Sequence, residues 1–156
     1  MSFIFTRQHP LVSLTPRVHR ADAASAELLS SVIKAASRNS SAKKETQESK
    51  RLETLIKADA LTDAALLLIA IELPQWQLRR LACDEGIWHC TLSRRGELPD
   101  WLGESIEAQH ADMTLALICA YLEAVQQHES ETDDPRSSVS RLQDEHFQTL
   151  CCENFR

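Results

Sequence analysis

Apolar residues recur at two different spacings along this chain, and the two spacings separate helical from strand-like stretches. Between residues 42 and 73 they come every three or four positions, and no glycine or proline interrupts them before Pro74, which is typical of an amphipathic helix. The repeat consists of Leu52, Leu55, Ile56, Ala60, Leu61, Ala64, Leu67 and Leu68. After Ala64 nearly every position is apolar, so this end should lie in the core. One long helix, or two helices with a kink near Asp59, would fit the pattern.

The spacing changes to alternation in residues 75–95, QWQLRRLACDEGIWHCTLSRR, and this predicts a β-hairpin. Gly86 supplies the positive φ that the turn requires. The adjacent Arg79 and Arg80 interrupt the alternation, as a β-bulge would. In the second strand one set should face the core and the other should point away from it: Trp88, Cys90 and Leu92 inward, and Ile87, His89 and Thr91 outward.

A second helix is predicted from Met113 to about Gln127, with Asp112 as its cap. Its expected buried stripe is Leu117, Ile118, Tyr121, Leu122 and Val125, with alanines at 116, 120 and 124 allowing close approach. Residues 96–105 read as a loop in which Asp100 caps one helical turn. A short helix over residues 21–37 also fits its apolar spacing.

These elements predict an α+β protein with a core ordered long helix, β-hairpin, helix, between flexible N- and C-terminal tails. We expect residues 1–42 to be a basic, largely flexible arm, residues 43–128 to be the α-β-β-α core domain, and residues 129–156 to be an acidic linker with a short docking tail. Two strands alone are marginally stable in water. Either the SFIF segment at residues 2–5 adds a strand, or two chains pair their hairpin edges; we favour edge pairing, and therefore a homodimer.

The charge distribution fits a basic arm on an acidic body. The net charge is −6, but residues 1–51 carry nine lysines and arginines against four acids, a net +5, whereas the remainder carries a net −11. Such an arm can contact polyanions or fold back on its own body. The longest apolar run, residues 64–71, is too short for a membrane span, and no signal peptide is evident. We expect a cytoplasmic protein with no membrane association.

Five cysteines without the spacing of a secreted framework indicate free thiols in a reducing compartment. Cys83, Cys90 and His89 lack the paired spacing of a structural zinc site, and His110, Cys119 and His128 do not share one helix face. We therefore expect no metal and no cofactor. The adjacent Cys151 and Cys152 are the candidate redox pair, and they leave a thiol- or metal-responsive protein as an alternative function.

Recognisable catalytic patterns do not occur in the sequence: there is no G-x-S-x-G, no P-loop, no G-x-G-x-x-G and no HExxH. Glu104 and Glu107 would share one face of a helix, but such pairs are usually solvated charge. No catalytic residue is assigned, and an enzyme is the less favoured class.

The hairpin holds the candidate interaction residues: Trp76, Arg79, Arg80, His89, Thr91, Arg94 and Arg95. The arginines together with Trp76 for base stacking leave a nucleic-acid-associated factor as a second alternative. The acidic body and the lack of a basic recognition helix make nucleic acid an unlikely partner. The simpler interpretation is that the arginines keep a sheet edge soluble.

Residues 59–124 resemble a family of small uncharacterised bacterial proteins, in their WHC-LS strand, their LP-W loop and the LAL of their last helix. The TLALICAYLEA helix is also loosely similar to phage-type α-β-α sandwich domains. Neither resemblance implies a known activity. The sequence therefore predicts a small, non-catalytic interaction or regulatory module of bacterial origin, whose partner is another protein or a second copy of itself.

Overall fold

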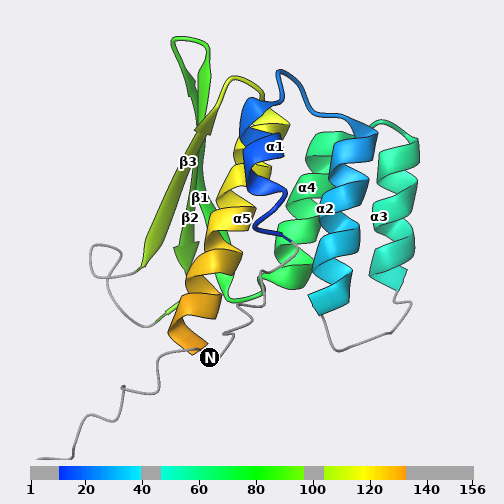
Figure 1. The fold of residues 1–156 in the computed structure, drawn as a ribbon. Coiled ribbons are helices and arrows are strands. Elements are labelled where there is room, and N and C mark those ends of the chain that lie inside the picture. Colours follow the sequence, from blue (N-terminus) through cyan, green and yellow to red (C-terminus); the bar gives the residue numbers. More distant parts are fainter. Residues whose placement is uncertain (1–10, 40–46, 97–103, 133–156) are drawn as a thin grey trace, which may run out of the picture.

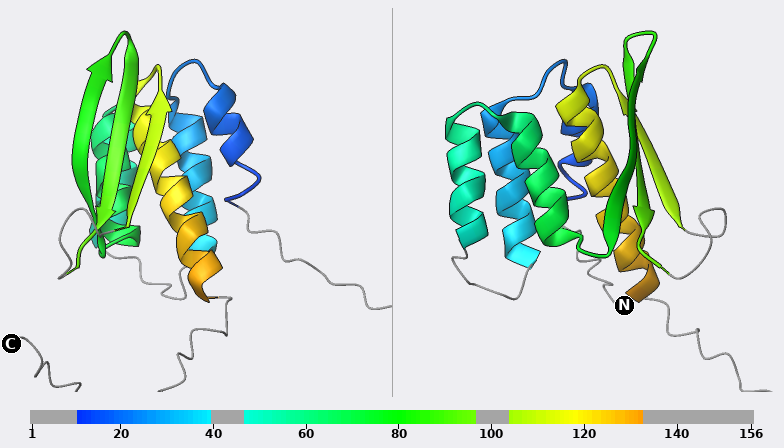
Figure 2. Two further views of the ribbon diagram at one scale, coloured as in Figure 1. Left: turned by 90° about the vertical axis from the view of Figure 1, so that its left-hand side faces the viewer. Right: turned by 180° about the vertical axis from the view of Figure 1, so that it is seen from behind.

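The computed structural model describes residues 11–39, 47–96 and 104–132, which form five helices and three strands (Figure 1). The elements are α1 (Thr15–Arg20), α2 (Ala26–Asn39), α3 (Gln47–Lys57), α4 (Leu61–Glu72), β1 (Trp76–Asp84), β2 (Ile87–Arg94), β3 (Ser105–His110) and α5 (Met113–Thr132). The strands form one antiparallel sheet in the order β1-β2-β3. All the described helices lie on one side of this sheet (Figure 2). The α+β class is confirmed.

Part of the expected flexible arm is folded. Residues 11–39 form α1 and α2, and their apolar side chains belong to the same buried cluster as those of α4 and α5. Val18, Leu29 and Val32 are each 0% exposed. The prediction of a flexible arm is therefore wrong for residues 11–39. The basic residues of this segment lie on the surface of these short helices, and a few apolar residues hold the helices in the core.

The helical stretch from 42 to 73 is two helices, not one. The chain breaks after Lys57, where Asp59 takes a φ of 58°. The N–H of Ala60 donates to the carbonyl of Leu55 at 2.9 Å, and the N–H of Asp59 donates to that of Ile56 at 3.1 Å. These two bonds form a Schellman motif with aspartate in the left-handed position. The kink near Asp59 is thus a complete helix end, after which α4 runs back beside α3.

The hairpin has the predicted turn and bulge. Asp84 pairs with Ile87 across the two-residue turn Glu85-Gly86, whose φ values of 48° and 83° are those of a type I′ turn. The register of β1 against β2 shifts between Leu78 and Arg80. That bulge lets two consecutive arginines occupy one strand without turning the apolar residues after them to the wrong face.

The third strand comes from a segment for which we expected a loop. Residues Ser105–His110 form β3, which pairs with β2 so that Ile106 lies opposite Leu92 and Ala108 opposite Cys90. Ile106 and Ala108 are buried, whereas Glu107 points to the other face. Glu104 and Glu107 therefore do not share a helix face. The short alternation Ile-Glu-Ala-Gln was the available signal, and the SFIF segment lies outside the described residues.

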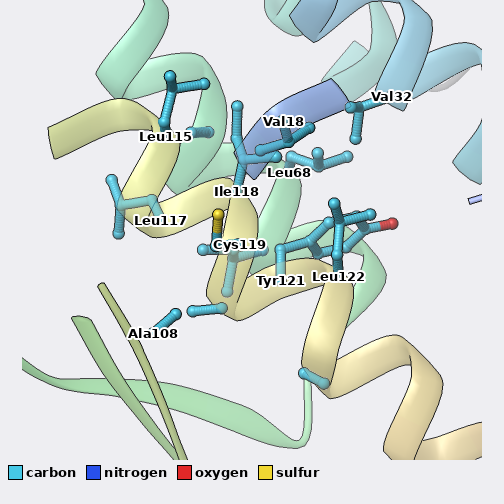
Figure 3. Close-up of a cluster of buried hydrophobic side chains, with 14 of the residues drawn as sticks. Val18, Val32, Leu68, Ala108, Leu115, Leu117, Ile118, Cys119, Tyr121 and Leu122 are labelled. Carbon is cyan, nitrogen blue, oxygen red and sulfur yellow. The ribbon is translucent and has the colours of Figure 1, made fainter. Parts of the chain in front are cut away.

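Helix α5 lies between the sheet and the other helices (Figure 3). Its start is capped as predicted, because the Asp112 carboxylate accepts the N–H of Leu115 at 2.9 Å. The expected single buried stripe is too narrow, since every residue from Thr114 to Leu122 is buried. The sheet covers one side of α5, and α1 and α4 cover another. Within the described residues, no helix is long and apolar enough to cross a membrane.

Leu92 and Leu78 offer a matched test of this arrangement. They are cross-strand partners on the helix-facing side of the hairpin, but Leu92 is 0% exposed and Leu78 is 38% exposed. We expect Leu92→Ala to lower the free energy of unfolding by about 2–5 kcal/mol, because it leaves a cavity in the core. Leu78→Ala should cost about 1 kcal/mol or less. Urea unfolding followed by circular dichroism measures both, and equal losses would contradict the placement of α5 over β2.

Candidate interaction surface

The sheet has one covered face and one open face. Cys90, Leu92 and Ile106 point toward the helices and are buried. Their neighbours in the strands, including His89, Thr91 and Glu107, point the opposite way, onto a face that no described helix covers (Figure 2, left). We call this second face the outer face. His89 and Thr91 therefore lie where the alternation predicted.

The bulge determines where the two arginines of β1 lie. Arg80 pairs with Thr91, which places it on the outer face. Arg79 is directed there as well, because its Nε donates to the Ser93 hydroxyl at 3.0 Å. Both side chains are exposed. A bulge thus presents two adjacent cations on the same face of a strand, where a regular strand would separate them.

The other two candidate arginines do not join Arg79 and Arg80 in one cluster. Arg94 pairs in register with Trp76, on the helix-facing side, and its guanidinium lies 2.9 Å from the Glu104 carboxylate. Arg95 is exposed just past the end of β2, and its backbone N–H donates to the carbonyl of Gln75 at 2.6 Å. The four arginines are therefore divided between two faces, and one of them already has an acidic partner.

Trp76 is a core residue. It is 4% exposed, and its indole Nε1 is buried without a hydrogen-bond partner in the described part of the chain. An unpaired buried donor costs stability, so the ring is retained for its packing between α4 and the sheet. It has no exposed face on which a base could stack, and the proposed stacking role for Trp76 is wrong.

His89 is held by an acid on the next strand. Its Nδ1 lies 3.6 Å from a carboxylate oxygen of Glu107, and the two side chains are 26% and 59% exposed. The contact becomes an ion pair when the imidazole is protonated. A pair so open to solvent contributes little to stability. It makes the centre of the outer face polar and well hydrated.

Strands β1 and β3 form the two edges of the sheet, and β1 is the edge strand that α5 does not cover. Helix α5 packs on β2 and β3, and β3 covers the far edge of β2. Of the three large apolar side chains that are exposed in the described regions, Leu78 at 38% and Ile87 at 39% belong to the hairpin; the third is Val12 at 44%. The turn of the hairpin also extends past the ends of the helices (Figures 1 and 2).

The described cysteines differ sharply in environment. Burial raises the pKa of Cys90 to about 11 and that of Cys119 to about 12, and for Cys119 the nearby Glu123 and Cys90 add to the effect. Cys83 is exposed. The Cys119 sulfur lies 3.8 Å from the His19 Nδ1, yet so high a pKa keeps this thiol protonated and unreactive at neutral pH. Cys151 and Cys152 lie outside the described residues.

Within the described residues, the cysteines are not part of a metal site. Over residues 11–39, 47–96 and 104–132, no group of three or more histidines, cysteines or acids is placed to hold a metal ion. Cys83 and Cys90 do not face each other across the hairpin, because Cys83 pairs with Trp88 and Cys90 with Leu81.

A cavity of about 320 Å³ lies on the opposite side of the molecule, between α2, α3 and α4. Its lining mixes apolar residues, with Leu52 and Leu68 as buried members, and polar ones. Glu53 and Glu72 also line it. Burial raises the pKa of Glu72, whose carboxyl has lost part of its hydration.

Comparisons with protein families, with curated proteins and with solved structures give no match for this chain. The resemblance to small bacterial proteins therefore stays an expectation.

The buried thiols predict a clear labelling pattern. With iodoacetamide at pH 8, Cys83 should be alkylated readily in the folded protein, whereas Cys90 and Cys119 should react only after unfolding, because both are buried and protonated. Peptide mass spectrometry before and after addition of urea reads out each site. Fast labelling of Cys119 without urea would show that α5 is not enclosed as described.

Glu72 should make stability depend on pH. Burial raises its folded pKa, so a cost of ionising it is present at neutral pH and disappears as the pH falls below the range in which an ordinary glutamate titrates. Glu72→Gln should therefore raise the free energy of unfolding at pH 7 and change it little near pH 3. Glu53→Gln, at an exposed carboxyl of the same cavity, is the control. Equal effects of Glu72→Gln at both pH values would contradict this account.

Proposed function

We propose that the protein is a small, non-catalytic interaction module that associates with a second copy of itself through the open edge of β1. The observation that supports this proposal is the edge of β1: α5 packs on β2 and β3, while Leu78 stays exposed on β1, whose outer edge pairs with no strand in the described part of the chain.

An open strand edge presents backbone N–H and C=O groups that readily pair with another strand. When two identical edges pair, the backbone groups of both edges form hydrogen bonds, and the result is a closed two-fold assembly. The turn next to this edge of β1 extends past the ends of the helices (Figure 1). Exposed apolar side chains next to the edge would lose water on association.

The two alternatives receive less support. The nucleic-acid hypothesis needed an exposed Trp76 and a single arginine cluster, whereas Trp76 is buried and the arginines are divided. The thiol hypothesis depends on Cys151 and Cys152, which lie outside the described residues, and the described core thiols are protonated. Self-association at β1 uses only residues whose exposure is known.

Sedimentation equilibrium over a wide range of protein concentration tests the proposal. We expect the wild-type protein to self-associate, and Leu78→Lys to weaken the association about tenfold or more, because it places a charge beside the pairing edge. Val12→Lys changes an apolar side chain of similar exposure away from the hairpin, so it should have no effect. A wild-type monomer at every concentration, or equal effects of the two lysines, would refute the proposal.

A further inference from the structure

The charges on β1 and its turn have opposite signs on the two sides of Ala82. Arg80 comes two residues before it and Asp84 two residues after it; Arg79 and Glu85 repeat the relationship at three residues. Arg80, Ala82 and Asp84 follow one another on the outer face, because Arg80 pairs with Thr91 and Ala82 with His89. A strand with this arrangement is complementary in charge to an antiparallel copy of itself.

The backbone of β1 allows the same symmetry. Asp84 and Ile87 flank a two-residue turn, so their backbone groups bond to each other, and the groups along β1 then alternate in direction. By this alternation the N–H and C=O groups of Leu81 and Cys83 point to the open edge. An antiparallel partner centred on Ala82 would bring Leu81 opposite Cys83, which is the alignment that a pair of backbone hydrogen bonds requires.

We propose that two copies of this chain pair β1 with β1, antiparallel and centred on Ala82, so that Arg80 of each copy lies opposite the partner's Asp84. The inference rests on the proposed self-association and specifies its register. Arg80 and Asp84 are both exposed, and in the described part of the chain neither forms an ion pair, so both charges are available to a partner.

Neighbouring registers lack this complementarity. Centring the pair on Leu81 places Arg80 opposite Ala82, and centring it on Cys83 places Asp84 opposite Ala82. Centring it on Arg80 places two arginines directly opposite each other, which is unfavourable. If the two-fold axis passes between two residues, a residue whose backbone groups point to the open edge lies opposite one whose groups point to β2. Such a pair cannot form backbone hydrogen bonds across the interface. Ala82 is the centre that satisfies both the backbone and the charges.

The location of this segment suits the pairing. Residues 80–84 follow the bulge, so they belong to the regular part of β1, next to the turn that extends past the helices (Figure 2). Their small central residue, Ala82, is half-buried and lets the two strands approach. The bulge itself lies outside the paired residues.

A charge-swap experiment on the full-length protein tests the register. Arg80→Glu creates two Glu–Asp contacts in the symmetric pair, and Asp84→Arg creates two Arg–Arg contacts, so each variant alone should self-associate about tenfold more weakly or worse. An equimolar mixture of the two variants restores opposite charges at both positions. Sedimentation equilibrium should therefore show a heterodimer of near wild-type affinity, and circular dichroism confirms that each variant is folded.

The outcomes separate the register from the proposed function. Loss of association in each variant and recovery in the mixture support the register. Two results would overturn the register and leave self-association intact. In the first, the wild-type protein dimerises and neither substitution weakens the dimer. In the second, both substitutions weaken it but the equimolar mixture does not recover the wild-type affinity. A wild-type protein that is monomeric throughout overturns both. Arg95→Glu, at an exposed arginine beside the start of β1 and at the far end of the hairpin from residues 80–84, is the control for a general effect of charge and should leave the association unchanged.

Discussion

Burial of α5 is the constraint on which the rest of the described structure depends. The first half of α5 is buried on every side from Thr114 to Leu122, where the sheet encloses one side while α1 and α4 enclose another. One side chain ties these parts together. Asp112 caps α5, and its other carboxylate oxygen accepts the backbone N–H of Ala24 at 3.2 Å, between α1 and α2. The N-terminal helices are thereby fixed to the start of the central helix.

The size of a single helix then explains the open edge. A helix is about 10 Å across, and neighbouring strands lie about 4.8 Å apart, so one helix covers about two strands. Helix α5 covers β2 and β3, and β1 extends beyond it. Strands β1 and β3 form the two edges of the sheet, and of these β1 is the one that lies beyond α5 and carries the exposed Leu78. Self-association is proposed at the place where the helical layer ends.

The chemistry of the described residues agrees with a module that acts through its surface. The thiols of Cys90 and Cys119 are protonated because they are buried, and the outer face carries hydrated polar groups such as His89 and Glu107. Two features distinguish β1 from the other two strands. Its bulge presents Arg79 and Arg80 together, and its charges reverse sign about Ala82.

Local pattern alone determined the hairpin, its turn at Gly86, its bulge at the two arginines and the capped start of α5, because each depends on residues close together in sequence. Only the tertiary structure decided the rest. Residues 105–110 form a strand because they pair with the free edge of β2. Residues 11–39 are folded because their apolar side chains pack in the same core as α5. The same packing buries Trp76 and leaves Arg80 exposed. Burial is a property of contacts between distant segments, so neither residue's exposure could be read from its neighbours in the chain.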